Sequence, residues 1–208
     1  MNDYIKMLSE QDKLSISISP NRWQFEENPY IISGPCSVES EEMIVDWAQK
    51  MKRVGVNALR GGAYKPCTYP ITKEVGSNGW KEGLREDGLR FLKTAREETG
   101  LPIVSEIMDA YQITGSTMDC IDIVQVGTRN FQNYTLLDAL GELDVPILLK
   151  RGTWGTIDEI LGAVERILVG GNEKVAICLR GVVGMPSYRH VFPSIRWAPD
   201  LMMIPALK

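Results

Sequence analysis

Short runs of apolar and β-branched residues recur along this chain and alternate with longer amphipathic segments. Six of these runs are predicted to be β-strands: residues 30–33, 56–59, 103–105, 121–126, 146–149 and 175–179. Apolar residues predominate in each run, which is typical of parallel strands covered on both faces. A strand with one face in water would instead show polar residues at every second position. The pattern therefore predicts buried parallel strands.

Helix signals fill the segments between these runs. After the first run, glutamates open a segment that basic residues close before Gly55, an order that complements the helix dipole. The apolar stripe of this segment includes Trp47 and Met51, which we expect in the core. Apolar residues at 91–95 and 136–140 indicate two further helices.

A fourth helix is predicted to begin at Thr156, which forms a capping box with Glu159 three residues later. Apolar residues then recur at helical spacing up to Gly170 and Gly171. Strands and helices thus alternate along the chain, and this order predicts an α/β fold with a parallel sheet.

The position of the polar residues distinguishes a barrel from an open sheet. Every predicted strand is followed by polar or charged groups, as the rim of a TIM (β/α)8-type barrel requires, and no GxGxxG motif follows a strand. We therefore predict a TIM-type α/β barrel that is incomplete, because about six of the eight strands are found. An unclosed barrel leaves two sheet edges exposed, so we expect a homo-oligomer or a completing partner chain.

The length of 208 residues suits one large domain and is short for two. We interpret residues 1–28 as an N-terminal extension that could contain a short β element, since Ile16 and Ile18 alternate with serines there. Residues 29–208 are predicted to form the barrel domain, truncated before its last strands.

Charge and composition disfavour several classes of function. The net charge of -4 and the pI near 5.2 argue against a nucleic-acid-binding protein, which normally presents a basic surface. No apolar stretch approaches the roughly 18 residues of a membrane span, and the start of the chain is too polar for a secretory signal. The cysteines lack CxxC spacing, which favours a reducing compartment. We expect a cytoplasmic protein that binds neither nucleic acid nor membrane.

Five cations stand at or just past the ends of predicted strands: Arg60, Lys65, Arg129, Lys150 and Arg180. Guanidinium groups bind phosphate and carboxylate bidentately, and ammonium groups add a point charge. A single arginine at a strand end is more often a surface or ion-pair residue. The ordered set, with its neighbouring glycines, instead favours a pocket for small anionic metabolites.

The strand ends also carry a specific series of motifs. In chain order they are ISGPCSVES, LRGGAYKPCTYP, VSEIMD, QVGTRNFQN, ILLKRG and ICLRG. The ordered set closely resembles the 3-deoxy-D-arabino-heptulosonate 7-phosphate (DAHP) synthases, particularly the short microbial type related to the 3-deoxy-octulosonate 8-phosphate synthases. The resemblance implies a barrel-fold transferase that condenses phosphoenolpyruvate with erythrose 4-phosphate and releases phosphate, at the entry to the shikimate pathway of aromatic amino-acid biosynthesis.

The resemblance further implies roles for the matching residues. The five cations would hold phosphoenolpyruvate, with Lys65 also near the aldehyde. Glu106 would be an acidic residue beside the phosphoenolpyruvate pocket, and Thr68 would contact the sugar phosphate. Cys36 would bind the divalent metal of the family, Mn, Fe, Zn or Co, which polarises the aldehyde. Without the resemblance, Cys36 could be a buried structural thiol and Glu106 could simply pair with a nearby cation.

Three departures from the family pattern limit these expectations. Cys67 stands where the family usually has the arginine that grips the erythrose phosphate, and Leu179 replaces a glutamate. The remaining metal ligands, a histidine and acidic residues, are expected beyond the end of the chain, and His190 is not assigned as a ligand. We interpret Cys67, Cys120 and Cys178 as structural.

Two alternatives to the DAHP synthase reaction therefore stay open. One is a related phosphoenolpyruvate-dependent aldol synthase for another phosphosugar, suggested by the change at Cys67. The other is a non-catalytic phosphate-binding remnant or a partial subunit.

Overall fold

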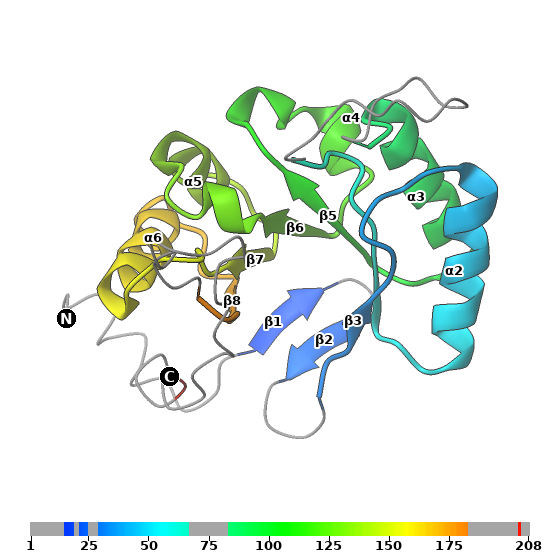
Figure 1. Cartoon of the computed structure of the whole chain (residues 1–208), viewed down its shortest axis with the longest axis horizontal. Coiled ribbons are helices and arrows are strands. Elements are labelled where there is room, and N and C mark those ends of the chain that lie inside the picture. The colour runs from blue at the N-terminus through cyan, green and yellow to red at the C-terminus, as the bar shows by residue number, and fades with distance from the viewer. Residues whose placement is uncertain (1–14, 19–20, 25–28, 67–82, 183–203, 205–208) are drawn as a thin grey trace, which may run out of the picture. The chain divides into compact units, whose positions relative to one another are not determined.

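The computed structural model describes residues 15–18, 21–24, 29–66, 83–182 and 204 (Figure 1). Within these residues the chain divides into two compact units, the first within Leu14–Gln125 and the second beginning at Val126. The predicted boundary between an extension and a barrel domain stays a prediction. None of the described helices has the length and apolar character that crossing a membrane requires.

The first unit contains an antiparallel pair and most of the parallel strands. In the pair, β1 (Ser15–Ile18) runs against β2 (Asn21–Gln24). The sheet then follows the order of the sequence: β3 (Ile32–Ser33), β4 (Ala58–Arg60), β5 (Ile103–Ile107) and β6 (Ile123–Val126), whose last residue begins the second unit. The β3–β4 and β4–β5 pairs are parallel. Every residue of β5 and β6 is buried, which confirms the prediction of covered strands for these two, whereas both residues of β3 are half-buried.

Two long helices lie side by side in the first unit, α2 (Glu41–Arg53) and α3 (Glu86–Thr99) (Figure 1). Helix α2 begins after Ser40, whose side chain accepts a hydrogen bond from the Met43 backbone at 3.1 Å. Its buried face carries Ile44 and Ala48. The expectation that Trp47 is a core residue is wrong, because its side chain is 39% exposed and the Lys50 ammonium lies over its ring.

Helix α3 begins earlier than its apolar residues indicated. Its start lacks a side-chain cap, because Arg85 occupies the N-cap position and makes no capping hydrogen bond through its side chain. The helix ends at Gly100, which adopts the left-handed conformation that glycine favours at helix ends. After β5, the chain forms the short helices η1 (Ala110–Gln112) and α4 (Gly115–Met118).

The second unit pairs β7 (Ile147–Lys150) in parallel with β8 (Val175–Cys178). Its helices are η2 (Thr128–Asn130), α5 (Tyr134–Gly141) and α6 (Ile157–Val169). The predicted capping box of α6 is confirmed, since Thr156 Oγ1 accepts from the Glu159 backbone at 3.2 Å and Glu159 Oε2 accepts from the Thr156 backbone at 2.8 Å. Glycines allow α5 and α6 to approach closely, because a Cβ on Gly170 would lie 2.6 Å from the Gly141 backbone.

All six predicted strands are present, with ends displaced by up to two residues. The displacements at the carboxyl ends matter for function. Arg60 and Lys150 are the last residues of β4 and β7, so the strand itself fixes their backbones. Glu106 lies inside β5 and does not follow it, which corrects the expected strand end.

Candidate functional site

In the first unit, the loops after β3 and β4 pack closely because glycines remove side chains between them. A Cβ on Gly34 would lie 2.0 Å from the Arg60 carbonyl oxygen, and one on Gly62 would lie 2.7 Å from the Cys36 carbonyl oxygen. The Val38 backbone also donates to the Gly62 carbonyl at 3.0 Å. These contacts bring the GPCS turn beside the segment that carries Arg60 and Lys65.

Three predicted site residues meet at this point: Cys36, Arg60 and Lys65. The pKa of the Cys36 thiol is lowered, mainly by a hydrogen bond with Lys65, while partial burial opposes the shift and Arg60 adds to it. Arg60 Nη1 also donates to the Pro35 carbonyl at 3.3 Å. Cys36 is exposed, so the alternative of a buried structural thiol is wrong. The turn presents an accessible sulfur with enhanced thiolate character between two cations.

Glu106 is buried, with 4% of its surface exposed. Its Oε2 accepts a hydrogen bond from Gln125 Nε2 on β6 at 2.9 Å. A buried carboxyl group requires such partners because water does not reach it. Sequence reasoning did not assign a role to Gln125. The signal was available, since one polar residue inside an otherwise apolar strand needs a buried hydrogen-bond partner.

In the second unit, the other three predicted cations lie at or after strand ends. Lys150 closes β7 and is half-buried, whereas Arg129 lies in η2 after β6 and is exposed. Arg180 follows β8, and its Nη1 donates to Thr128 Oγ1 at 3.0 Å. The Nε atom of Arg180 is buried and has no hydrogen-bond partner among the described residues. The loops after β6 and β8 are therefore joined by a guanidinium that keeps one donor available.

Phe131 connects the loops after β6 and β7. Its ring is 1% exposed and fills the space beside two glycines, so that a Cβ on Gly152 would lie 2.0 Å from it and one on Gly155 would lie 2.8 Å from it. The buried Arg151 side chain donates to the Gly155 carbonyl through Nε at 3.1 Å and Nη2 at 2.7 Å. Arg151 thus shapes the loop directly after Lys150, a structural role that sequence reasoning missed.

A chain of hydrogen bonds reinforces the same loop. Trp154 Nε1 donates to Gln132 Oε1 at 3.3 Å, and Gln132 Nε2 donates to Glu159 Oε1 at 2.9 Å. These bonds join the segment after β6, the segment after β7 and the start of α6. They tie together the segments that follow Arg129 and Lys150, which favours a preorganised anion site.

The predicted cations fall into two groups, Arg60 and Lys65 in the first unit and Arg129, Lys150 and Arg180 in the second. Their convergence on one ligand remains a prediction. Thr68, Cys67 and His190 lie outside the described residues. Cys120 is buried, as expected of a structural cysteine, and its burial raises the pKa of the thiol.

The described residues do not make a complete metal site. No group of three His, Cys, Asp or Glu side chains within them is placed to hold an ion. Cys36 supplies one suitable sulfur donor, but the groups that lower its pKa, Lys65 and Arg60, are cations and not further ligands.

Comparison with known proteins identifies the family of this chain. Residues 18–201 match the model of the DAHP synthetase I family. The chain belongs to this family. It is 41% identical over 152 residues to a phospho-2-dehydro-3-deoxyheptonate aldolase of Thermotoga maritima, an alignment that covers 73% of the chain and 42% of the relative. It is 28% identical over 151 residues to a 2-dehydro-3-deoxyphosphooctonate aldolase of Syntrophotalea carbinolica, covering 73% of the chain and 54% of the relative.

Solved structures of the family agree with the fold. The crystal structure of the DAHP synthase of Thermotoga maritima superposes with a TM-score of 0.76 at 32% identity, covering 94% of this chain and 52% of that one. A truncated form of the DAHP synthase from the same organism gives 0.74 at 32% identity, covering 96% and 66%. These matches confirm the predicted fold class, a TIM-type barrel represented in part. The chain spans about half the length of the relatives it matches.

Proposed function

We propose that this chain takes part in the DAHP synthase reaction, the condensation of phosphoenolpyruvate with erythrose 4-phosphate at the start of aromatic amino-acid biosynthesis. Membership of the DAHP synthetase I family supports the proposal. The observation that carries it is the guanidinium of Arg180, which is fixed by Thr128 and keeps a buried Nε donor without a partner among the described residues. A buried donor in this position favours an anionic ligand, because leaving it unsatisfied is costly.

Phosphoenolpyruvate is the ligand that suits the cations best. It carries a phosphate and a carboxylate, so it offers several oxygen acceptors to Arg60, Arg129 and Arg180 and compact negative charge to Lys65 and Lys150. In the proposed reaction, carbon 3 of phosphoenolpyruvate attacks the aldehyde carbon, water adds to carbon 2, and phosphate leaves by cleavage of its C–O bond. Lys65 would donate a proton to the forming alkoxide.

Glu106 and Thr68 have proposed supporting roles. The buried carboxyl of Glu106, held by Gln125, would lie beside the phosphoenolpyruvate pocket and orient groups there. Thr68 would contact the sugar phosphate through its hydroxyl. These two assignments follow the family motif.

Cys36 is proposed as a ligand to a divalent metal, Mn, Fe, Zn or Co. Its exposure and lowered pKa support this role, since metals bind the thiolate form. The described residues do not complete the coordination. Titration with Co²⁺ tests the assignment: a thiolate charge-transfer band in the native chain should be absent in Cys36→Ser, and a native chain without the band would refute it.

The proposal is tested first by measuring phosphoenolpyruvate binding and then by measuring turnover. Calorimetry should detect phosphoenolpyruvate binding to the native chain and about a tenfold or greater loss in Arg180→Gln, as expected for removal of a charged hydrogen-bond donor. Arg166→Gln is the matched control, because Arg166 lies in the same unit but pairs with Asp138 on an exposed surface. Turnover is then measured as heptulosonate formed from both substrates with Mn²⁺. Equal affinity of the native and Arg180→Gln chains would refute the proposal.

A second candidate is a related phosphoenolpyruvate-dependent aldol synthase that uses another phosphosugar. The similarity to 2-dehydro-3-deoxyphosphooctonate aldolases and the presence of Cys67 favour it. A panel of phosphorylated aldoses of four and five carbons distinguishes the two, since the preferred aldehyde gives the higher kcat/KM. Binding of phosphoenolpyruvate without metal uptake or turnover would instead favour a non-catalytic phosphate-binding role or a partial subunit. We further propose that the protein is cytoplasmic. We also propose that it self-associates or joins a completing partner chain, and sedimentation of the purified chain tests this association.

A further inference from the structure

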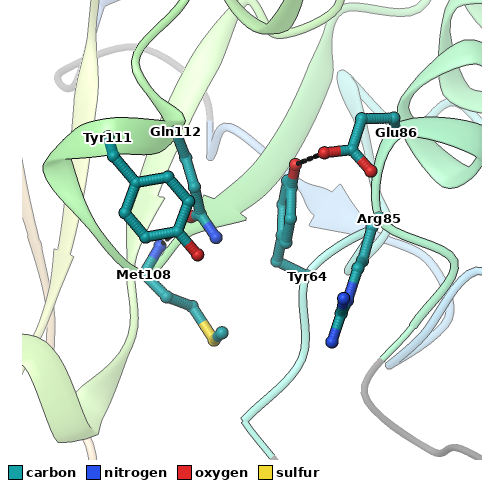
Figure 2. Close-up of a pocket in the computed structure, with 6 residues that line it drawn as sticks. All are labelled: Tyr64, Arg85, Glu86, Met108, Tyr111 and Gln112. Carbon is teal, nitrogen blue, oxygen red and sulfur yellow. Dashed lines mark hydrogen bonds between the residues drawn. The ribbon is translucent and has the colours of Figure 1, made fainter.

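Two consecutive residues at the start of α3 hold two consecutive residues of the loop after β4. The Arg85 amide donates to the Ala63 carbonyl at 2.9 Å. The next residue, Glu86, accepts a hydrogen bond through Oε1 from the Tyr64 hydroxyl at 3.0 Å (Figure 2). Lys65 follows Tyr64 directly, so these contacts end one residue before a cation of the candidate site.

The Tyr64 hydroxyl is a donor that lies away from water. The residue is 6% exposed. Burial, followed by the hydrogen bond with Glu86, raises the pKa of Tyr64 to about 12, so the hydroxyl keeps its proton at neutral pH. A buried polar group needs a hydrogen-bond partner, because leaving it unsatisfied is unfavourable. The Glu86 carboxylate therefore anchors the Tyr64 side chain in one position.

Arg85, which borders a pocket of about 340 Å³, has a strained backbone where it makes its contact with Ala63 (Figure 2). Its φ of 53° and ψ of -125° are accessible to glycine but unfavourable for a residue with a side chain. Gly83 allows the close approach, since a Cβ there would lie 2.1 Å from the Ala63 carbonyl oxygen. Strain of this kind persists only where the surrounding contacts impose it, and it clusters at functional sites. The strain indicates that the hold on this loop has a role beyond folding.

Strand β5 fixes the backbone of the same loop up to Ala63. The Gly61 amide donates to the Val104 carbonyl at 3.0 Å. The Ala63 amide donates to Oγ of the buried Ser105 at 3.4 Å. The Tyr64 side chain extends this anchoring by one residue, to the position directly before Lys65.

The Lys65 side chain has a defined direction. Its stem passes Gly62, where an added Cβ would lie 3.6 Å from Lys65 Cδ. Its ammonium group makes a hydrogen bond with Cys36. A long lysine side chain loses much rotamer freedom when it keeps one direction, so its backbone must be held for the direction to last. A shift of the loop at Tyr64 would therefore move the Lys65 ammonium out of place.

We propose that Tyr64 and Glu86 are positioning residues, and that the hydrogen bond between them sets the place of the Lys65 ammonium in the candidate site. Tyr64 acts through the residue that follows it, and Glu86 acts through Tyr64. A misplacement of about 1 Å is enough to weaken a positioned charged group. The inference rests on the proposed function, because it explains how the Lys65 of that function is held.

Tyr64→Phe tests the hydrogen bond, because it removes the hydroxyl and keeps the ring. Calorimetry on the full chain should show phosphoenolpyruvate affinity about 3- to 10-fold weaker than in the native chain, as expected when one hydrogen bond is lost and one cation is displaced. Glu86→Ala should cause a loss of the same size. Glu86→Gln should retain most of the affinity, since its side-chain oxygen can accept the same hydrogen bond.

The double variant Tyr64→Phe/Glu86→Ala tests whether the two residues act as one pair. Each single change breaks the same hydrogen bond, so the double variant should lose no more phosphoenolpyruvate affinity than either single variant.

Hydrogen exchange gives a second measurement that needs no ligand. The amides of residues 61–65 should exchange about tenfold faster in Tyr64→Phe, because the loop opens more often without a hydrogen bond to a charged group. The amides of α2, in the same unit, should exchange at the native rate. A change confined to the loop separates local positioning from a general loss of stability.

Two matched variants serve as controls. Tyr134→Phe removes the hydroxyl of an exposed tyrosine in the second unit. Asp87→Ala removes a carboxylate from the same helical turn as Glu86, where Asp87 pairs with the exposed Arg90. Both variants should bind phosphoenolpyruvate with native affinity and leave the exchange of residues 61–65 unchanged.

Three results would overturn the inference. The first is native phosphoenolpyruvate affinity in Tyr64→Phe. The second is a double variant whose loss equals the sum of the two single losses. The third is faster exchange in α2 as well, with a lowered melting temperature, which would show that the pair is merely structural. If the native chain does not bind phosphoenolpyruvate, the proposed function fails, while faster exchange confined to residues 61–65 still supports the hold on Lys65.

Discussion

Substitution of Gly152 by alanine tests how the loop after β7 is held. In the native structure the space beside this glycine is filled by Phe131, and a Cβ would lie 2.0 Å from Cε1, 2.4 Å from Cδ1 and 2.7 Å from Cζ of that ring. Contacts this short cannot persist, so either the ring or the loop must move. The ring has little freedom, since it is 1% exposed and its other edge meets Gly155, where an added Cβ would lie 2.8 Å from Cζ.

The expected cost is about 1–3 kcal/mol of unfolding free energy, the range for overpacking a well-packed core. Urea denaturation followed by fluorescence and circular dichroism measures it. Gly162→Ala is the matched control, because nothing lies within 4 Å of the added Cβ in the middle of α6. Alanine at that helical position should stabilise the chain by about 0.5–1 kcal/mol.

A double substitution tests whether contact with Phe131 causes the loss of stability in Gly152→Ala. Phe131→Leu removes part of the ring that meets the new methyl group, so the Gly152→Ala change should cost less in that background than alone, a non-additive result. The argument would be refuted if Gly152→Ala were neutral, or if the two substitutions were simply additive. Lys150 directly precedes this loop as the last residue of β7, so Gly152→Ala should also weaken phosphoenolpyruvate binding in the proposed function.

Three further predictions concern local chemistry. Lys65→Met should raise the pKa of the Cys36 thiol, because the hydrogen bond with Lys65 is the main cause of its lowered pKa. The rate of Cys36 alkylation by iodoacetamide at neutral pH should fall, and the midpoint of its pH profile should move upward. An unchanged pH profile would contradict this cause. Thr156→Ala should reduce the unfolding free energy by about 1 kcal/mol through loss of the α6 cap, measured by urea denaturation, whereas Thr156→Ser should retain most of it. Gln125→Leu removes the hydrogen bond to the buried Glu106 carboxyl group and should reduce the unfolding free energy by about 1–3 kcal/mol, measured by urea denaturation. A neutral effect would show that this hydrogen bond does not hold the carboxyl group.

The strands and α6 were predictable because their signals are local. A run of mostly apolar residues is enough to predict a strand, and the Thr156–Glu159 pair specifies a helix start through hydrogen bonds within four residues. The positions of the cations at or after strand ends were predictable for the same reason, since each cation lies within a few residues of its own strand. Trp47 was not, because helical spacing alone does not reveal which flank of the stripe meets α3.

The amino-acid sequence by itself determined the α/β alternation, the family and the set of cations at the strand ends. Only the tertiary structure decided that Cys36 is accessible between Arg60 and Lys65, that Phe131 fills the space beside Gly152, and that Arg85 borders a pocket in a strained conformation. The physical reason is the separation in sequence of the residues that interact. Strands and caps depend on neighbours a few residues away, whereas thiol acidity, close packing and backbone strain depend on groups that are distant in sequence and meet only when the chain folds.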